Sequence, residues 1–415
     1  MRHNTDRIRS THGGNLPRPA AFDALLQQGP VVTAEVAAEL PDAVQYVVDR
    51  QLECGVDVIN DGEYVKAAGG GSYSGYIHQR VTGWEVLPVD PAKPPKRAGV
   101  GGRERRMFPG FYESGLWLQG SGGPVRPGYF KPGRPVERTT ERVATGPVRY
   151  TGHDAIKADV DALTRAMESK AMGSQALAGK AAQAEGFVAA LGPLSLGAGA
   201  RNEYYSSEEE YMTAVAEVVR EEYKAITDAG FIVQVDEPEF ATTWQFYPDW
   251  DVPRYRQYLE FCVRIINHAL DGLPEDQIRF HVCWGSGHRP HVTDIDLVHI
   301  ADLLLKINAQ AYSVEAGNVR HAHEWTVWRD IKLPDGKILV PGVISHATDL
   351  VEAPGLVAER LVNYASVVGR ENLQAGTDCG IGSRVGHEEI VWAKLRAMAQ
   401  GCELASERLW GRRSA

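Results

Sequence analysis

The sequence predicts a single (β/α)8 barrel that spans residues 1–415, with a Pro/Gly/Arg-rich insertion at about residues 88–150, after the second strand. Short apolar segments alternate with segments of helical periodicity, which is the pattern of βαβ units around a parallel sheet. About eight strand segments are recognisable, the number that closes such a barrel, and polar residues follow most of them. A doubly wound open sheet is the alternative, but no Gly-x-Gly-x-x-Gly turn follows the first strand.

The first part of the chain contains two of the expected strands. A β-prone start at residues 6–19 includes the first strand, near Ile8, and continues into a Gly-Gly-Asn turn. A helix is expected at 42–54, because its valine and leucine residues recur at helical spacing. The second strand is expected at 56–59 and is followed shortly by Glu63.

After the insertion, strands and helices alternate regularly. The helix expected at Tyr211–Asp228 has the clearest start, since Ser206 and Ser207 precede three glutamates. Serine caps helix N-termini, and acidic side chains favour the first turn. The other strands are expected at 187–191, 231–235, 279–283, 311–315, 338–344 and 373–378. Helical segments are expected around 155–183, and further helices at 254–269, 298–305, 357–368 and 388–407.

Composition restricts the class of protein. Charged residues make up 24% of the chain and hydrophobic residues 43%, as in globular proteins, and a formal net charge of -10 argues against a nucleic-acid partner. No apolar run approaches the roughly 20 residues that span a bilayer, so no membrane partner is expected. The N-terminus lacks an apolar signal segment, and the five cysteines are few and scattered. These features predict a cytoplasmic protein without disulfides.

The insertion combines basic and aromatic residues. Its basic residues could attract an anionic substrate. The aromatic residues indicate instead that the segment packs against another surface, which is the interpretation we favour, and a homo-oligomer remains open. The basic residues are Lys96, Arg97, Arg103, Arg105 and Arg106.

His281 and Cys283 form the pattern on which the functional interpretation rests. They stand two residues apart on an expected strand, so both side chains point to one face and can reach one metal ion. Cys379 follows a later strand, and Glu315 ends another. Zinc binds N, S and O ligands tetrahedrally, so His281, Cys283, Glu315 and Cys379 together predict a Zn2+ site.

These residue types also have purely structural interpretations. Cysteines in helical patterns are expected to be ordinary buried side chains, which applies to Cys54, Cys262 and Cys402. Asp378 could cap a turn or orient a metal ligand. Five histidines leave a second metal site open, although two of them precede Glu324 in what could be a helix start. They are His288, His291, His299, His321 and His323.

Seven motifs occur in order along the chain and together resemble those of the cobalamin-independent methionine synthase family. They are THGGNLPRP, VINDGE, VQVDEP, HVCWG, YSVEA, GVISH and GTDCGIG. The chain more closely resembles the short, single-barrel members of this family, often described as methionine synthase II-like, which include epoxyalkane:coenzyme M transferase. The resemblance covers nearly the whole chain apart from the insertion.

The resemblance implies a (β/α)8 barrel in which zinc activates a thiol. The zinc ligands it implies are His281, Cys283, Glu315 and Cys379.

It also implies a substrate site. Glu63 and Asp236 match residues that hold the amino group of homocysteine, and His346 matches a histidine implicated in proton transfer near the methyl donor. Asn15 replaces a serine that is common in the segment touching the thiol, and Arg18 follows in the same segment. The N-terminal barrel domain of the long synthases has no counterpart, so binding of a polyglutamylated folate is not implied.

Three functions follow from these observations. The leading hypothesis is zinc-dependent transfer of an alkyl group, with methyl as the expected group, to a thiol such as homocysteine. The donor would be a folate, a corrinoid or another small molecule. The second is opening of an epoxide by a thiol such as coenzyme M. Glu63 and Asp236 favour an amino-bearing thiol over a sulfonate, which requires arginine, and Arg18 keeps the second hypothesis open. The third is a non-catalytic barrel stabilised by zinc.

Overall fold

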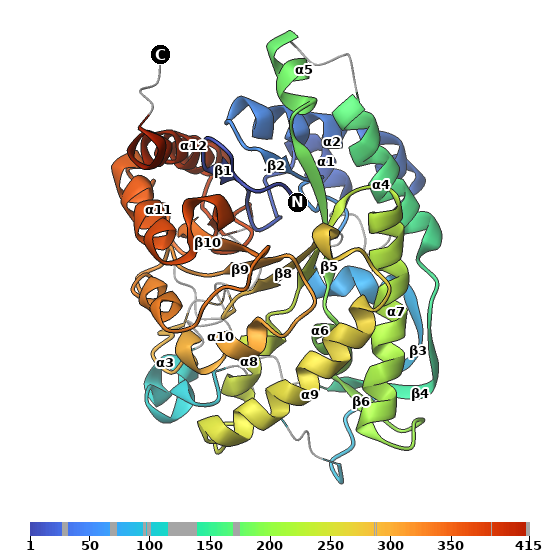
Figure 1. The fold of residues 1–415 in the computed structure, drawn as a ribbon. Coiled ribbons are helices and arrows are strands. Elements are labelled where there is room, and N and C mark those ends of the chain that lie inside the picture. The colour runs from blue at the N-terminus through green and yellow to red at the C-terminus, as the bar shows by residue number, and fades with distance from the viewer. Residues whose placement is uncertain are drawn as a thin grey trace.

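Eight parallel strands form the central sheet of the computed structural model, in the order β1-β11-β10-β9-β8-β7-β5-β2 (Figure 1). The structure describes residues 1–26, 32–66, 73–93, 97, 101–114, 139–168, 175–285, 287, 289–382 and 384–411, without the side chains of residues 73, 74, 175 and 176. The strands are β1 Arg9–Ser10, β2 Val58–Ile59, β5 Glu185–Leu191, β7 Ile232–Asp236, β8 Ile278–Val282, β9 Ala311–Val314, β10 Ile338–Ile344 and β11 Gln374–Thr377.

The sheet curves into a nearly closed barrel. From β2 to β11, each barrel strand pairs with the next barrel strand along the chain, and β11 returns to pair with β1. Between β1 and β2, the backbone N–H of Asp57 donates to the carbonyl of Ser10 at 3.1 Å. The hydroxyl of Thr11 donates to the carbonyl of Val58 at the same distance. The predicted (β/α)8 barrel is therefore confirmed.

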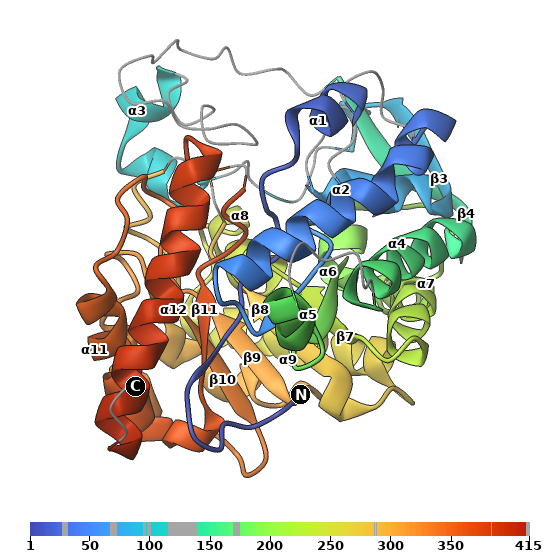
Figure 2. The ribbon, with the colours of Figure 1, turned by 90° about the horizontal axis from the view of Figure 1, so that it is seen from above.

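Helices surround the barrel in both views (Figures 1 and 2). The long helices bury an apolar stripe; in α7, for example, Val215, Val219 and Ile226 are fully buried. The helices are α1 Ala20–Leu26, α2 Ala34–Glu53, α3 Pro109–Glu113, α4 His153–Glu168, α5 Gln175–Ala181, α6 Pro193–Gly197, α7 Glu208–Asp228, α8 Glu239–Phe246, α9 Val252–Leu270, α10 Ala301–Leu304, α11 Pro354–Val368 and α12 Glu388–Trp410.

The predicted start of α7 is confirmed in detail. The hydroxyl of Ser207 accepts the backbone N–H of Glu210 at 3.1 Å, while the carboxylate of Glu210 accepts the backbone N–H of Ser206 at 2.9 Å. Two N–H groups that the helix itself leaves unpaired are thus satisfied by side chains.

The short helices α1, α3, α6 and α8 were not predicted, and the region expected at 155–183 contains the two helices α4 and α5. Two further differences have a clear physical reason. Helix α2 begins at Ala34 rather than residue 42 and continues through Pro41, because Thr33 caps it and Val36 and Leu40 extend its buried face. The helix expected at 298–305 is instead a short 3-10 turn at Leu297–His299 followed by α10. Periodicity alone detects neither a proline tolerated by packing nor a break inside a short apolar run.

The insertion leaves the barrel after β2, as predicted, and packs against it. Strands β3 Val81–Pro88 and β4 Thr140–Tyr150 pair antiparallel and form a second sheet with β6 Ala200–Asn202. Figure 2 shows α3 at the same end of the barrel as α1 and α8, whereas both chain termini lie toward the opposite end.

The basic residues of the insertion are engaged within the chain. Arg97 pairs with Glu239 at the start of α8. Arg103 donates to the carbonyl of Trp244 in the last turn of that helix and to those of Tyr247 and Trp250 beyond it, at 2.6–2.9 Å. Arg105 lies over the ring of Tyr112, and Arg106 pairs with Asp249. These contacts support packing against the barrel over attraction of an anionic substrate; Lys96 lies outside the described residues.

Candidate metal centre and active site

The structure brings His281, Cys283 and Cys379 together at the carboxyl ends of β8 and β11. One ligand atom from each lies within 4.8 Å of those of the other two. His281 and Cys283 are almost completely buried, at 2% and 6% exposure, and Cys379 is partly buried. A nitrogen and two sulfurs thus converge on one point, as the alternation of side chains on β8 predicts.

The orientation of His281 leaves one ring nitrogen available. Nδ1 lies 3.0 Å from the hydroxyl of Ser313, its neighbour on β9 in the parallel register. Nε2 is buried and has no hydrogen-bond partner among the described residues. A buried nitrogen of this kind costs free energy unless a further group binds it, so the arrangement fits a metal ligand.

The two cysteines have opposite acidities. A hydrogen bond with Cys283, helped by the nearby His281 ring, holds the pKa of Cys379 well below its usual range against the opposing effect of burial. The same bond, together with burial, raises the pKa of the Cys283 thiol. Cys379 therefore loses its proton more readily than Cys283, and the thiolate is the form of cysteine that binds metals.

Glu315, the fourth predicted ligand, lies in an adjacent group. Its Oε1 accepts the backbone N–H of Trp284 at 2.7 Å, and its Oε2 accepts the side-chain amide of Asn318 at 2.8 Å. An oxygen of Glu315 lies within 4.8 Å of ligand atoms of His346 and Asp378. Burial and the neighbouring Asp378 raise the pKa of Glu315 well above its usual range.

Asp378 organises the loops around this group. Its Oδ1 accepts the backbone N–H groups of Ala316 and Gly317 at 2.8 and 2.6 Å. A Cβ at Gly342 would lie only 2.2 Å from the same oxygen, so the strand must carry glycine there. Asp378 thus connects the end of β9 to the end of β11 across β10. Its position beside Cys379 in the sequence indicates a structural role, but it does not predict these hydrogen-bond partners.

Glu63 and Asp236 form the acidic part of the site. Burial, and next the charge of Asp236, raise the pKa of Glu63 well above its usual range. The amide of Gln234 donates to Asp236 at 2.8 Å. Glu63 has the left-handed φ of 58°, and its Oε1 occupies the space where a Cβ of Gly14 would lie. Two crowded carboxylates offer a strong site for a cation.

Asn15 and Arg18 lie on the segment between β1 and α1. The carbonyl of Asn15 accepts the backbone N–H groups of Ile381 and Gly382 at 3.1 and 2.9 Å, directly after Cys379. Asn15 is therefore beside the cysteine cluster. Arg18 donates through Nε to Asp23 of α1 at 2.7 Å, so part of its charge is already paired.

His346 follows β10 and faces Asp378. Its Nδ1 lies 3.9 Å from the carboxylate of Asp378, and burial lowers the pKa of its ring to about 4. The imidazole is consequently neutral near pH 7. It must take up a proton before it can give one to a leaving group.

The structure does not support a second metal site at the other histidines. The described residues contain two groups with metal-ligand spacing, and neither includes these histidines. His291 pairs with Asp294 at 2.7 Å, and His321 pairs with Glu324 at 2.7 Å beneath the ring of Trp284. His288 lies outside the described residues.

The buried His321 network predicts a pH-dependent stability. Hydrogen bonds to Asp294 and Glu324 outweigh burial and raise the pKa of His321 to about 10. A histidine with a raised pKa stabilises the fold fully below about pH 6.5, and this stabilisation is lost as the pH rises through 10. Relative to His321→Gln, the free energy of unfolding of the wild type should fall by about 1.4 kcal/mol per pH unit between pH 7 and 9, in urea titrations. Parallel curves for the two proteins would contradict this assignment.

Comparisons with known proteins show which family this chain resembles. A family model described as the catalytic domain of the cobalamin-independent synthase matches residues 190–403. A methionine synthase of Sulfurisphaera tokodaii is 25% identical over 219 residues, which are 52% of this chain and 56% of that protein. A 2-hydroxypropyl-CoM lyase of Xanthobacter autotrophicus is 24% identical over 233 residues, or 50% and 57% of the two chains. The chain therefore spans little more than half the length of these curated relatives.

A solved structure shows the same fold over nearly the whole chain. The B12-independent methionine synthase from Shewanella sp. W3-18-1 superposes with a TM-score of 0.64 and 19% identity, covering 98% of this chain and 100% of that one.

Within the described residues, each helix is too short or too polar to pass through a bilayer.

Proposed function

This chain belongs to the family of the cobalamin-independent synthase catalytic domain, and on that premise we propose a function. The protein transfers an alkyl group to a thiol with the help of zinc, and methyl is the group that we expect. The observation that carries the proposal is the cluster of His281, Cys283 and Cys379, in which no described residue forms a hydrogen bond with the buried Nε2 of His281. All three residues lie within the matched segment.

The residues present fit zinc. One imidazole nitrogen and two cysteine sulfurs are the donors that zinc prefers, and the low pKa of Cys379 supplies a thiolate. Glu315 is the fourth candidate, from the adjacent group. When bound, zinc supplies a positive charge that favours the thiolate form of a substrate thiol.

The remaining residues would bind the substrate and manage its protons. Glu63 and Asp236 would hold an ammonium group and so orient an amino-bearing thiol, of which homocysteine is one. In the transfer, a C–S bond forms and the bond between the alkyl carbon and its donor atom breaks. His346, neutral near pH 7, would receive the thiol proton and pass a proton to the departing atom.

The test begins with the zinc content of the purified protein. Homocysteine and coenzyme M are then added separately while the zinc K-edge, or the spectrum of the cobalt-substituted protein, is followed. One equivalent of zinc that gains a sulfur ligand from homocysteine alone supports the proposal. A response to coenzyme M alone favours epoxide opening, as in the lyase relative. Zinc that ignores both thiols indicates a structural site, and absence of zinc with intact cysteines contradicts the proposal.

Substitution of Asp236 tests the ammonium site. In Asp236→Asn the side chain keeps its shape but loses its charge, and a charge-assisted hydrogen bond is worth about 1.5–3 kcal/mol. The KM for homocysteine should therefore rise roughly 10- to 100-fold, with a smaller change in kcat. Steady-state kinetics with homocysteine and with a thiol that lacks the amino group provide the measurement.

The control for this substitution is Asp249→Asn, because Asp249 lies in an exposed pair with Arg106. It should leave the kinetics unchanged. An equal loss with both thiols in Asp236→Asn would mean that Asp236 does not recognise the amino group.

A further inference from the structure

Asn318 occupies a bridging position between two carboxylates. Its Nδ2 donates to Glu315 Oε2 at 2.8 Å and to Asp378 Oδ2 at 3.1 Å. Its Oδ1 accepts the backbone N–H groups of Arg320 and His321 at 2.9 and 3.1 Å. Each side of the amide meets partners of the opposite kind, so its orientation is fixed by four hydrogen bonds.

The backbone around Asn318 is built to bring its amide to this point. The loop after β9 approaches the end of β10 so closely that a Cβ at Gly317 would lie 2.8 Å from the carbonyl carbon of Ile344. Asp378 holds the same loop through Ala316 and Gly317. Asn318 therefore has little freedom to move away from Glu315.

Glu315 is thereby placed outside the cluster of the other three predicted ligands. Its Oε1 is occupied by the backbone of Trp284 and its Oε2 by Asn318. Its oxygen groups with His346 and Asp378, whereas His281, Cys283 and Cys379 form their own group. These two hydrogen bonds fix the direction of the Glu315 carboxylate, so it must turn away from at least one of them to reach a metal held by the three-residue cluster.

We propose that Asn318 is a positioning residue that competes with zinc for Glu315, and so keeps one coordination position accessible to the substrate thiol. This inference rests on the proposed function, because it needs zinc at the three-residue cluster. Loss of the amide donor removes the hydrogen bond that holds Glu315 Oε2, so the carboxylate can turn toward zinc. Zinc is then held more tightly, because it has a fourth protein ligand, and the substrate thiol must displace that ligand.

The experiment is a double-mutant cycle on zinc affinity, measured by competition with a chelator and without any turnover. Asn318→Ala should lower the zinc dissociation constant about tenfold or more when Glu315 is present. In the Glu315→Gln background the same substitution should have no effect. In the cobalt-substituted protein, Asn318→Ala should also raise by a similar factor the homocysteine concentration that half-saturates the spectral change.

Two further variants separate the amide donor from the loop turn. Asn318→Ser retains an oxygen that can accept the N–H groups of the turn, and it should shift zinc affinity in the same direction as Asn318→Ala. Asn202 makes the same kind of turn elsewhere, since its Oδ1 accepts the N–H groups of Tyr204 and Tyr205, but its amide donates only to carbonyls. Asn202→Ala should leave zinc affinity unchanged.

The outcomes distinguish this inference from the proposed function. A wild-type protein that binds no zinc overturns both. Three results would overturn the role of Asn318 alone. In these, Asn318→Ala weakens zinc binding, leaves it unchanged, or changes it equally with and without Glu315.

Discussion

Replacing Cys379 by serine is expected to reduce bound zinc from about one equivalent to near zero and to abolish thiol transfer. Cys379 is the cysteine whose pKa is lowered, so it supplies the thiolate of the cluster. Serine has a similar shape, but its hydroxyl remains protonated and is a poor ligand for zinc. Loss of one of three converging ligands should therefore weaken zinc binding by several orders of magnitude.

The measurement is metal analysis after gel filtration, together with transfer activity in added zinc. Cys402→Ser is the matched control, because Cys402 is also buried but lies in α12, away from the cluster. It should retain zinc even if it is somewhat less stable. A Cys379→Ser protein that keeps both zinc and full activity would refute the proposed mechanism.

The converging part of this site could be predicted because it depends on strand geometry. His281 and Cys283 share a face by alternation, and Cys379 follows a strand that closes the same barrel. Such information is local to each strand, and the barrel order supplies the rest. The same reasoning placed Glu315 at a strand end but could not show where its carboxylate points.

The position of Glu315 depends on contacts between loops. Trp284 and Asn318 reach it from different segments, and Asp378 fixes the loop that carries Asn318. These hydrogen bonds arise from side chains and turns whose approach is set by packing, for which a single sequence gives no periodic signal. The two glycines that permit the approach, Gly317 and Gly342, are equally compatible with ordinary turns.

The insertion shows a similar limit. Its composition indicated packing, but the partners were not predictable: Arg103 caps the end of α8, and Arg97 pairs with Glu239 at the start of that helix. Because α8 follows the strand that carries Asp236, the insertion is attached to a wall of the site.

Substitution of Lys394 should produce a large loss of stability, because Lys394 anchors the loop that carries His346. Lys394 is fully buried, and its ammonium donates to Glu352 at 2.9 Å and to the carbonyls of Ser345 and Leu350. Glu352 in turn accepts the backbone N–H of Ser345 at 2.8 Å. The pair therefore holds both backbone groups of the residue before His346.

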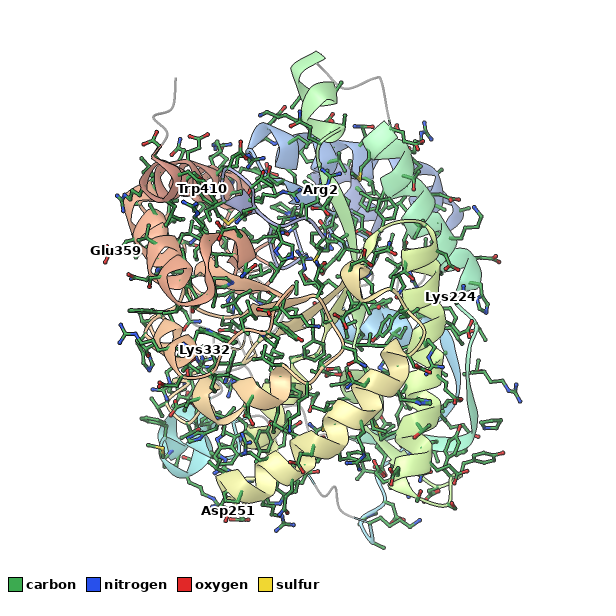
Figure 3. All side chains as sticks on the ribbon, viewed as in Figure 1. Arg2, Lys224, Asp251, Lys332, Glu359 and Trp410 are labelled. Atoms are coloured by element: carbon green, nitrogen blue, oxygen red, sulfur yellow. The ribbon has the colours of Figure 1, made fainter. Side chains whose placement is uncertain are left out.

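In Lys394→Met the carboxylate of Glu352 is left buried without its partner, which should cost about 3–5 kcal/mol of unfolding free energy in urea titrations. Adding Glu352→Gln should restore part of this loss, because the uncompensated charge is gone while an oxygen remains for Ser345. Lys224→Met is the control: Lys224 lies at the edge of the molecule in Figure 3 and pairs with Asp228, both about 60% exposed, so its loss should cost less than about 1 kcal/mol. Equal effects of the two lysine substitutions would show that the buried pair does not hold the loop, and His346 would then depend on β10 alone for its position.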